Sequence, residues 1–258
     1  FFSEDGICNF DLIKHINQFP DSTYFERMGI NIQDKEEVIK NYIKVQESIL
    51  KKNAIRFLKT HSYLFNIKNN PFTNLNCSLG VIYIVRDPRN VVTSFAKWMK
   101  KSLDKAADDM IDSYMMMGGD LLKKNKILHY VGPWNGNYNS WKSFKQPKRY
   151  LLIKYEELIN NKETAFRKIL SFIYGIQGLK TIIDNKKFNN VILTSDFYKM
   201  KKLEEKYGFN QARLDENKKQ VPFFDLGSKN DWKKTLKPEI IKKIENVFKK
   251  EMIELGYL

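Results

Sequence analysis

One stretch, VIYIVRDPRNVVTSFAKWM at residues 81–99, constrains the fold more than any other part of the chain. It opens with β-branched and aromatic residues without polar alternation, which predicts a strand covered on both faces and therefore a parallel sheet. An Asp-Pro pair ends the strand, and apolar residues then recur at helical spacing, so a helix begins near Pro88 or Arg89. Because a helix start offers free N–H groups, Arg86, Arg89 and the hydroxyl of Ser94 on or near it indicate a phosphate or sulfate site. An ion pair between Arg86 and the following aspartate, capping an ordinary turn, is an equally good interpretation.

A second motif, FLKTHSY at residues 57–63, places Lys59 and His61 on the same side of a short extended segment. A single histidine at a strand end is more often structural than functional. The lysine two positions away and the motifs further along the chain favour the functional interpretation here.

Length and composition exclude some classes of protein. The chain has 258 residues, 42% of them hydrophobic, which suits one large core, so we expect a single domain over residues 1–258. No apolar run approaches the roughly 20 residues that span a bilayer, and no secretion signal is evident, which predicts a cytoplasmic protein without a membrane span. Cys8 and Cys77 support neither a disulfide framework nor a cysteine metal site. A formal net charge of +15 attracts anionic partners but identifies none of them.

Strands and helices alternate along the chain, which predicts an α/β fold with a parallel sheet flanked by helices. Besides residues 81–99, the pattern predicts strands over 54–59 and 149–158 and an irregular stretch over 192–232. It predicts helices over 35–51, 104–128, 160–174 and 178–189, one after the Gly-Pro pair at 132–133, and one from Lys237 onward.

Five motifs stand in one order along the chain: KTH at 59–61, the strand ending at Arg86 with Ser94, Gly132-Pro133-Trp134 with Trp141, the strand ending Tyr155-Glu156-Glu157, and Gly227 followed by Asp231-Trp232-Lys233. In this order the chain resembles the cytosolic-type sulfotransferases over about residues 55–258. The resemblance implies a P-loop-NTPase-like sulfotransferase fold. It also implies transfer of a sulfuryl group from 3′-phosphoadenosine 5′-phosphosulfate (PAPS) to a hydroxyl or amine of a small-molecule acceptor, without a metal. The nucleotide product is 3′,5′-adenosine bisphosphate (PAP).

By this resemblance His61 is the general base that takes the proton from the acceptor, a role that suits an imidazole with an ordinary pKa near 6.5. Lys59 resembles the cation that holds the reacting sulfuryl group, because such transfer depends on positioning and cationic stabilisation. We expect the imidazole, this ammonium and the guanidinium of Arg86 to converge on one small cavity.

The resemblance also assigns the nucleotide contacts. Arg86 and Ser94 match the positions that bind the 3′-phosphate, one as a bidentate cation and the other as a hydroxyl donor. Tyr155 matches a tyrosine near the adenine, and Ser195 with Phe197 matches the pair that contacts the base. Ordinary packing in the core is an alternative for both aromatic rings, and it is the preferred one for Trp134 and Trp141.

The chain departs from the family in two places. Family members carry near the N-terminus a strand and a loop resembling Tyr-Pro-Lys-Ser-Gly-Thr-Thr-Trp, which wraps the 5′-phosphosulfate. Nothing in residues 1–54 resembles it, so we expect an N-terminally incomplete domain that binds PAPS weakly or not at all. The second departure is Asp225, which replaces an arginine of the Arg-Lys-Gly pattern before Gly227; Lys229 and Lys233 are candidate replacements for the lost cation.

Two other functions remain open on the sequence: a nucleotide kinase, which needs magnesium, and a non-catalytic basic protein that binds a polyanion. No zinc-finger, RNP or helix-turn-helix signature supports nucleic acid as the partner. The acceptor and the oligomeric state cannot be deduced, although the segments 104–130 and 198–222 are candidates for the acceptor pocket.

Overall fold

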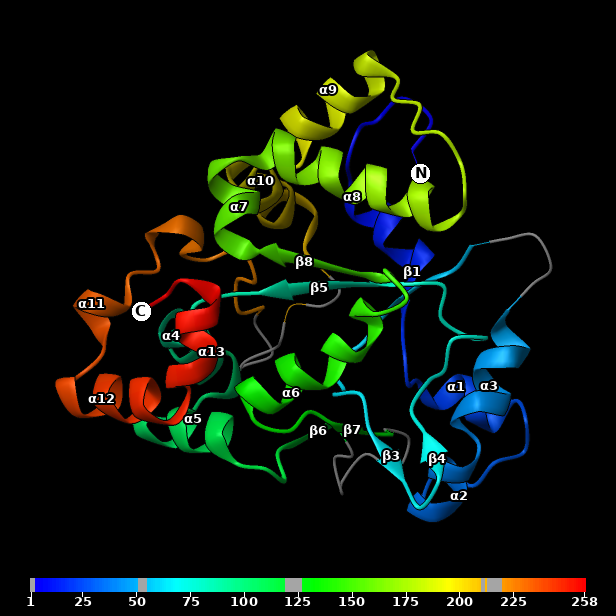
Figure 1. The fold of residues 1–258 in the computed structure, drawn as a ribbon. Helices are drawn as coiled ribbons and strands as arrows, with labels where there is room; N and C mark the ends of the chain where they lie inside the picture. Colours follow the sequence, from blue (N-terminus) through cyan, green and yellow to red (C-terminus); the bar gives the residue numbers. More distant parts are fainter. Residues whose placement is uncertain (1–2, 51–54, 119–126, 210–211, 213–219) are drawn as a thin grey trace.

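The computed structural model describes residues 3–50, 55–118, 127–209, 212 and 220–258, and Figure 1 shows their course. The described strands are β1 (Ile16–Gln18), β2 (Phe57–Lys59), β3 (Asn66–Ile67), β4 (Asn70–Pro71), β5 (Val81–Val85), β6 (Met116–Gly118), β7 (Leu128–Tyr130) and β8 (Tyr150–Lys154). The described α-helices are α1 (Ser22–Glu26), α2 (Lys35–Lys40), α3 (Tyr42–Ile49), α4 (Pro88–Met99), α5 (Leu103–Ile111), α6 (Trp134–Trp141), α7 (Tyr155–Asn160), α8 (Lys162–Ile176), α9 (Asn185–Thr194), α10 (Phe197–Tyr207), α11 (Trp232–Thr235), α12 (Pro238–Val247) and α13 (Lys249–Leu255). Short 3₁₀ helices lie at η1 (Phe10–His15), η2 (Lys142–Lys145) and η3 (Gly227–Lys229). The predicted α/β class with parallel strands is confirmed.

The parallel strands form two separate pairs. β5 pairs with β8, with Val81 opposite Tyr150 and Val85 opposite Lys154, and β1 pairs with β2 in the same parallel sense. The β3–β4 and β6–β7 pairs are antiparallel. In the part of the chain that the structure describes, no strand joins β2 to β5, so the predicted single sheet is present as two halves.

The turn between β5 and α4 forms as the sequence predicts. The carboxylate of Asp87 accepts a hydrogen bond from the backbone N–H of Arg89 at 2.9 Å, and Pro88 occupies the first helical turn. The same carboxylate pairs with the guanidinium of Arg89 at 2.7 Å. The ion pair at this turn therefore involves Arg89, and Arg86 makes other contacts.

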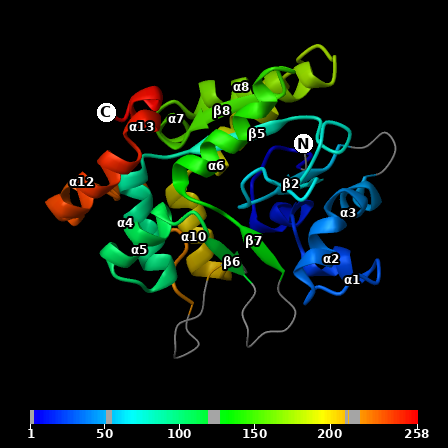
Figure 2. The same cartoon turned by 60° about the horizontal axis from the view of Figure 1, so that its bottom comes forward.

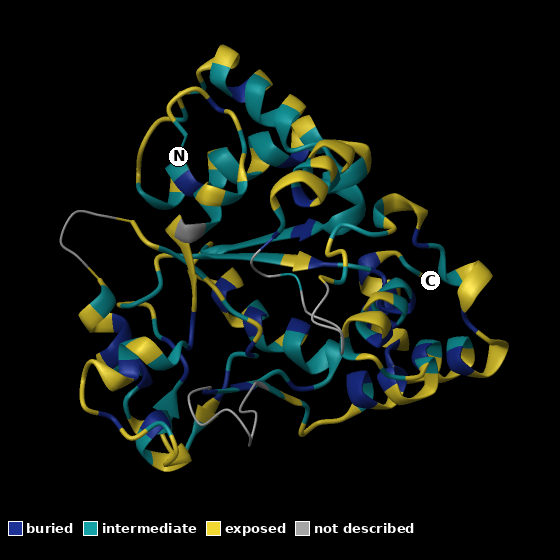
Figure 3. Ribbon diagram, turned by 180° about the vertical axis from the view of Figure 1, so that it is seen from behind, coloured by how far each residue is buried: buried dark blue, intermediate teal, exposed yellow. Residues whose placement is uncertain are grey.

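Helices cover the β5–β8 pair from opposite sides, with α7 and α8 above it and α6 below it in Figure 1. The buried residues form three clusters. One packs α1 and α3 against the β3–β4 pair, a second joins α4, α5 and α12, and a third, small one packs Val85 of β5 against Tyr138 and Leu255. Figure 3 shows buried residues on the inner faces of these helices and exposed ones outside. In Figure 2, as in Figure 1, the β6–β7 pair lies between α5 and the α1–α2 region.

The helix predicted over 104–128 is confirmed only over its first part. α5 ends at Ile111, and residues 116–118 form β6, which pairs with β7; residues 119–126 lie outside the described ranges. The methionine run before Gly118 has an apolar pattern that fits a helix, but pairing with a strand further along the chain decides its conformation.

Other predicted boundaries need correction. The stretch 192–232 is not irregular throughout, because it contains α10. The helix predicted over 35–51 breaks at Asn41, and the one predicted over 178–189 is displaced to Asn185–Thr194. The strand predicted over 149–158 ends at Lys154, where α7 begins. Within the described ranges, no helix is both long and apolar enough to cross a membrane.

Candidate active site

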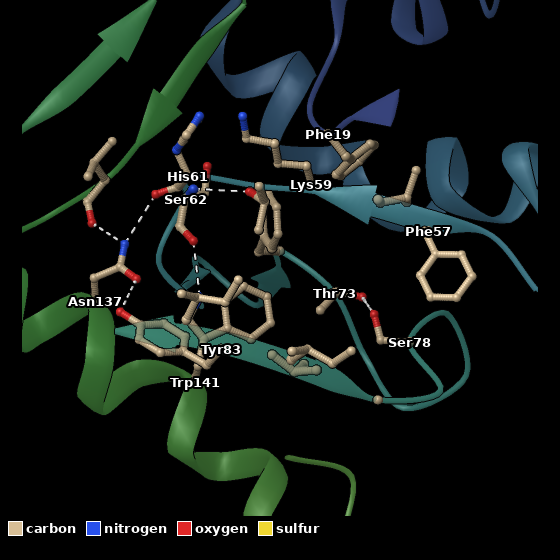
Figure 4. A pocket seen from close by; sticks show the side chains of 18 of the residues that line it. Phe19, Phe57, Lys59, His61, Ser62, Thr73, Ser78, Tyr83, Asn137 and Trp141 are labelled. Atoms are coloured by element: carbon tan, nitrogen blue, oxygen red, sulfur yellow. Dashed lines mark hydrogen bonds between the residues drawn. The ribbon is translucent and has the colours of Figure 1, made fainter. Parts of the chain in front are cut away.

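Lys59 and His61 lie together at the carboxyl end of β2, on the wall of a cavity of about 700 Å³ (Figure 4). Lys59 is the last residue of the strand, and His61 follows it by two positions, as the extended motif predicts. The opposite wall is formed by β5, including Ile82, Tyr83 and Ile84. Such a position, at the end of a parallel strand beside a cavity, is a common place for binding and catalytic groups in α/β proteins.

Helix α6 holds the backbone around His61 in place. The side-chain amide of Asn137 donates to the carbonyl of His61 at 3.1 Å, and the indole N–H of Trp141 donates to the carbonyl of Ser62 at 3.1 Å. The hydroxyl of Ser140 accepts a hydrogen bond from the N–H of Leu64 at 2.9 Å. Trp141 is 5% exposed, which supports the structural role expected for it. Three side chains of one helix therefore fix the segment that carries the imidazole.

The surroundings of His61 favour its neutral form. Desolvation lowers the pKa of His61 to about 4, and the positive charges of Lys59 and His129 act in the same direction. His61 as a residue is exposed, and nearby water reduces the cost of charging its ring. Burial also lowers the pKa of Lys59. The imidazole is therefore free to accept a proton at neutral pH.

His129 and Gln18 complete this group, and the sequence did not single them out. The rings of His61 and His129 lie 6.3 Å apart, and the Nε2 atoms of Gln18 and His129 are 3.0 Å apart. His129 is buried in β7. The sequence pattern predicted a helix over 104–128 and no strand at this position. Gln18 ends β1, and the pattern of residues 1–54 gave no sign of that strand.

A second group surrounds Arg86, the residue that follows β5. Its guanidinium lies over the ring of Tyr155 at 4.3 Å, and Nη2 donates to the carbonyl of Gly227 at 3.4 Å. Nε of Arg86 is buried and has no hydrogen-bond partner among the described residues. Gly227 has a φ of +56°, and a Cβ there would lie 2.7 Å from the ring of Phe197, so this close approach requires glycine. The structure therefore brings Arg86, Tyr155, Phe197 and Gly227 into one chain of contacts.

The two predicted serines are less directly engaged. The hydroxyl of Ser94 donates to the carbonyl of Asn90 on its own helix at 3.0 Å, and it is exposed. Ser195, which follows α9, has a buried hydroxyl without a hydrogen-bond partner in the described part of the chain. Each could donate to a bound anion or base, but Ser94 would first have to give up its present bond.

Asp225 forms an ion pair with Lys97 on α4, one helical turn beyond Ser94. The carbonyl of Asp225 also accepts a hydrogen bond from Lys201 at 3.4 Å. The acidic residue noted in the sequence thus neutralises a lysine beside the predicted phosphate contacts. Lys229 ends η3, two positions after Gly227.

The structure separates the predicted site into two groups. Among the described residues, the cavity is lined by Lys59 and His61 but not by Arg86, so the expected convergence on one small cavity holds for two of the three groups. Of the two candidate acceptor segments, 104–130 contributes Asp109, Met110, Met115 and Met117 to the lining, and the described part of 198–222 contributes nothing. The described residues contain no group of three or more His, Cys, Asp or Glu that could hold a metal ion.

Comparison with known proteins identifies the class to which this arrangement belongs. The family model described as "Sulfotransferase domain" matches residues 7–256, so the chain belongs to the sulfotransferase family. The family match favours sulfuryl transfer over the nucleotide kinase that the sequence left open.

The relatives agree on the family but are distant. The chain is 23% identical to flavonol 3-sulfotransferase of Flaveria bidentis over 226 residues, covering 84% of this chain and 67% of the relative. It is 24% identical to 3-beta-hydroxysteroid sulfotransferase of Cavia porcellus over 172 residues, covering 67% of this chain and 55% of the relative. The chain thus spans between about half and two thirds of the length of these curated relatives.

Solved structures support the fold. A mouse sulfotransferase in complex with PAP superposes with a TM-score of 0.54 at 18% identity, covering 80% of this chain and 69% of that one. Retinol dehydratase in complex with retinol and PAP superposes with a TM-score of 0.55 at 13% identity, covering 93% of this chain and 71% of that one.

Proposed function

We propose that this chain catalyses transfer of a sulfuryl group from PAPS to a hydroxyl, or an amine, of a small apolar acceptor. The observation that carries the proposal is the placement of His61 beside Lys59, on a cavity wall at the end of a parallel strand. The family match and the PAP-bound structural neighbours support the choice of nucleotide. The cytoplasmic location expected from the sequence stays a prediction.

The residues around Arg86 fit an adenosine bisphosphate. Arg86 has a buried Nε without a partner among the described residues, and its guanidinium lies 4.3 Å from the centre of the Tyr155 ring; this Nε is a donor available to a phosphate oxygen. The free hydroxyl of Ser195 and the ring of Phe197 lie two positions apart, one a hydrogen-bonding group and the other an aromatic face. We therefore propose that Arg86 with Ser94 holds the 3′-phosphate and that Tyr155, Ser195 and Phe197 surround the base, beside the backbone of Gly227.

When bound, PAPS supplies the sulfuryl group. On the protein side, neutral His61 accepts the proton of the acceptor hydroxyl as that oxygen becomes the nucleophile. Lys59 presents a positive charge beside it, where negative charge collects during transfer. Asn137 and Trp141 hold the backbone carbonyls of residues 61 and 62 and so fix the segment that places His61 on the cavity wall. The apolar side chains from segment 104–130 exclude water and suit an apolar acceptor.

Binding and transfer measured on the same protein test the proposal. We expect residues 1–258 to bind PAP in an NMR titration, which reads millimolar dissociation constants, and to move labelled sulfate from PAPS to members of a panel of phenols, sterols and alkyl alcohols. His61→Ala should abolish transfer and leave PAP binding within about twofold, because the imidazole lies outside the nucleotide group. His15→Ala, at an exposed position in η1, is the matched control and should change neither.

Absence of PAP binding at millimolar ligand, both by residues 1–258 and by the same residues preceded by the N-terminal strand and loop of a family member, would overturn the nucleotide assignment. Transfer retained by His61→Ala would remove His61 from the role of base. A chelator separates this reaction from the kinase alternative, since phosphoryl transfer from a nucleotide stops without magnesium.

A further inference from the structure

The segment that carries Gly227 is attached to α4 through a buried side chain, that of Asn230. This residue follows η3 and leads towards α11, in orange in Figure 1. It is 8% exposed, and its side-chain amide donates to the backbone carbonyl of Asn90 at 3.0 Å. The amide oxygen accepts a hydrogen bond from the hydroxyl of Thr93 at 2.7 Å. Because a carbonyl can only accept, the NH₂ group must face Asn90, and the orientation of the amide is therefore fixed.

The carbonyl of Asn90 is shared with Ser94. The hydroxyl of Ser94 donates to this oxygen at 3.0 Å, and the hydroxyl of Thr93 lies 2.8 Å from it. A carbonyl oxygen has two lone pairs, so three side-chain donors are more than it needs. Ser94 is exposed and can also donate to the carbonyl of Val91 at 3.2 Å, whereas Asn230 is buried and held at both ends of its amide. The Ser94 hydroxyl is therefore the donor that this carbonyl can lose at the least cost.

The backbone of Asn230 repeats this arrangement at Gly227. Its N–H donates to the carbonyl of Gly227 at 3.3 Å, and Nη2 of Arg86 donates to the same oxygen at 3.4 Å. When Arg86 turns to a bound anion, this carbonyl keeps a donor. Asn230 thus supplies a second donor to each of the two carbonyls that now engage Ser94 and Arg86.

We propose that Asn230 is a positioning residue for the 3′-phosphate. By donating to the carbonyls of Asn90 and Gly227, it leaves the hydroxyl of Ser94 and the guanidinium of Arg86 available to the nucleotide. This inference rests on the proposed function, because it takes the 3′-phosphate of PAP as the anion. A role in folding alone predicts instead that the loss of Asn230 weakens every adenosine nucleotide equally.

The test compares PAP with adenosine 5′-monophosphate, which lacks the 3′-phosphate, in NMR titrations of whichever form of the chain named above binds PAP. Thr93→Val is the parent protein, since the hydroxyl of Thr93 could otherwise replace the donor lost at Asn90. Asn230→Leu then removes both polar ends of the side chain at nearly constant volume, and Ser94 has to satisfy the carbonyl of Asn90. We expect PAP binding to weaken about 3- to 10-fold and monophosphate binding to stay within about twofold.

A double-mutant cycle shows whether this effect passes through Ser94. When Ser94→Ala is added to the parent, Asn230→Leu should change PAP binding by less than about twofold, because the hydroxyl that Asn230 releases is gone. Thr93→Val alone is the matched control: it changes the same network but keeps the donor of Asn230, so it should leave both nucleotides unaffected.

The contact with Gly227 is tested on the backbone. Residue-resolved amide hydrogen exchange should show that the N–H of Asn230 exchanges more slowly with PAP than with the monophosphate. The reason is that Arg86 then no longer competes with this N–H for the carbonyl of Gly227.

Urea denaturation of each variant establishes that it is folded, and Asn230→Ala in the same parent replaces Asn230→Leu if the latter does not fold. Three results would overturn the inference and leave the proposed function intact: equal losses for both nucleotides, unchanged PAP binding in the Asn230 variant, and a loss of the same size after Ser94→Ala. Absence of PAP binding by the parent protein in both forms would overturn the proposed function and this inference with it.

Discussion

Replacing Arg86 by alanine separates its proposed role at the 3′-phosphate from its structural contacts. A hydrogen bond between a guanidinium and a phosphate contributes about 1.5–3 kcal/mol, which corresponds to a dissociation constant weaker by about 10- to 150-fold. The variant also loses the stacking on Tyr155 and the bond to Gly227, but those losses affect any adenosine nucleotide alike. We therefore expect Arg86→Ala to weaken PAP binding by that factor and to weaken adenosine 5′-monophosphate, which lacks the 3′-phosphate, much less.

NMR titrations with both nucleotides measure the two dissociation constants. Arg149→Ala is the matched control, because Arg149 also donates to a backbone carbonyl, that of Leu75 at 3.1 Å, but lies before β8 at the opposite end of the same strand pair. It should leave both nucleotides unaffected. Equal losses for PAP and the monophosphate in Arg86→Ala would show that Arg86 only supports the fold of the site, and the assignment to the 3′-phosphate would be wrong.

Three further predictions address charge, pH and the core. Asp225→Asn should tighten PAP binding by about 2- to 5-fold in calorimetry, since it frees Lys97 from an exposed ion pair; unchanged or weaker binding would contradict this. A folded-state pKa of about 4 keeps His61 neutral well below pH 6.5. We therefore expect kcat/KM to stay level from pH 7 down to about 5 and to fall only at lower pH. A fall in kcat/KM centred at pH 6.5 or above would contradict the lowered pKa. Ile244→Ala, at a fully buried position of α12, should lower the free energy of unfolding by about 2–5 kcal/mol in urea denaturation. Ile253→Ala, 55% exposed on α13, should lower it by less than about 0.5 kcal/mol, and equal losses would refute the described core.

Local signals in the sequence predict the elements that carry Arg86 and His61. The apolar run, the Asp-Pro pair and the helical spacing give β5 at Val81–Val85 and the start of α4 at Pro88, both confirmed. The sequence also contains an N-cap signal for α10, because Asp196 precedes the helix. Its carboxylate accepts a hydrogen bond from the N–H of Tyr198 at 2.9 Å. The sequence of α10 is mostly polar, and the stretch that contains it was predicted to be irregular.

Elements made by distant pairing could not be predicted in the same way. β6 exists because it pairs with β7, so a run containing Met116 and Met117 becomes a strand although its spacing also fits a helix. β1 has three residues, all exposed, and only its pairing with β2 defines it. His129 lies on β7 and Gln18 on β1, so the sequence alone could not predict that they are neighbours of His61.

Both halves of the candidate site are fixed by residues far along the chain. Asn137 holds the carbonyl of His61 across 76 positions, and Gly227 receives the bond from Arg86 across 141 positions. The motifs can therefore form a site only when the whole domain is folded, which explains why their order carries more information than their spacing.

The distance between β2 and β5 decides how these two halves are related in space. Lys59 ends β2 and Arg86 follows β5, so the gap between these strands sets the separation of the proposed sulfuryl-binding cation from the proposed phosphate-binding one. Asn137 of α6 links the two strands, because its amide donates to the carbonyl of His61 and accepts a hydrogen bond from the hydroxyl of Tyr83 at 3.0 Å. These bonds hold both cations in place before a nucleotide arrives, which lowers the cost of the proposed binding of PAP.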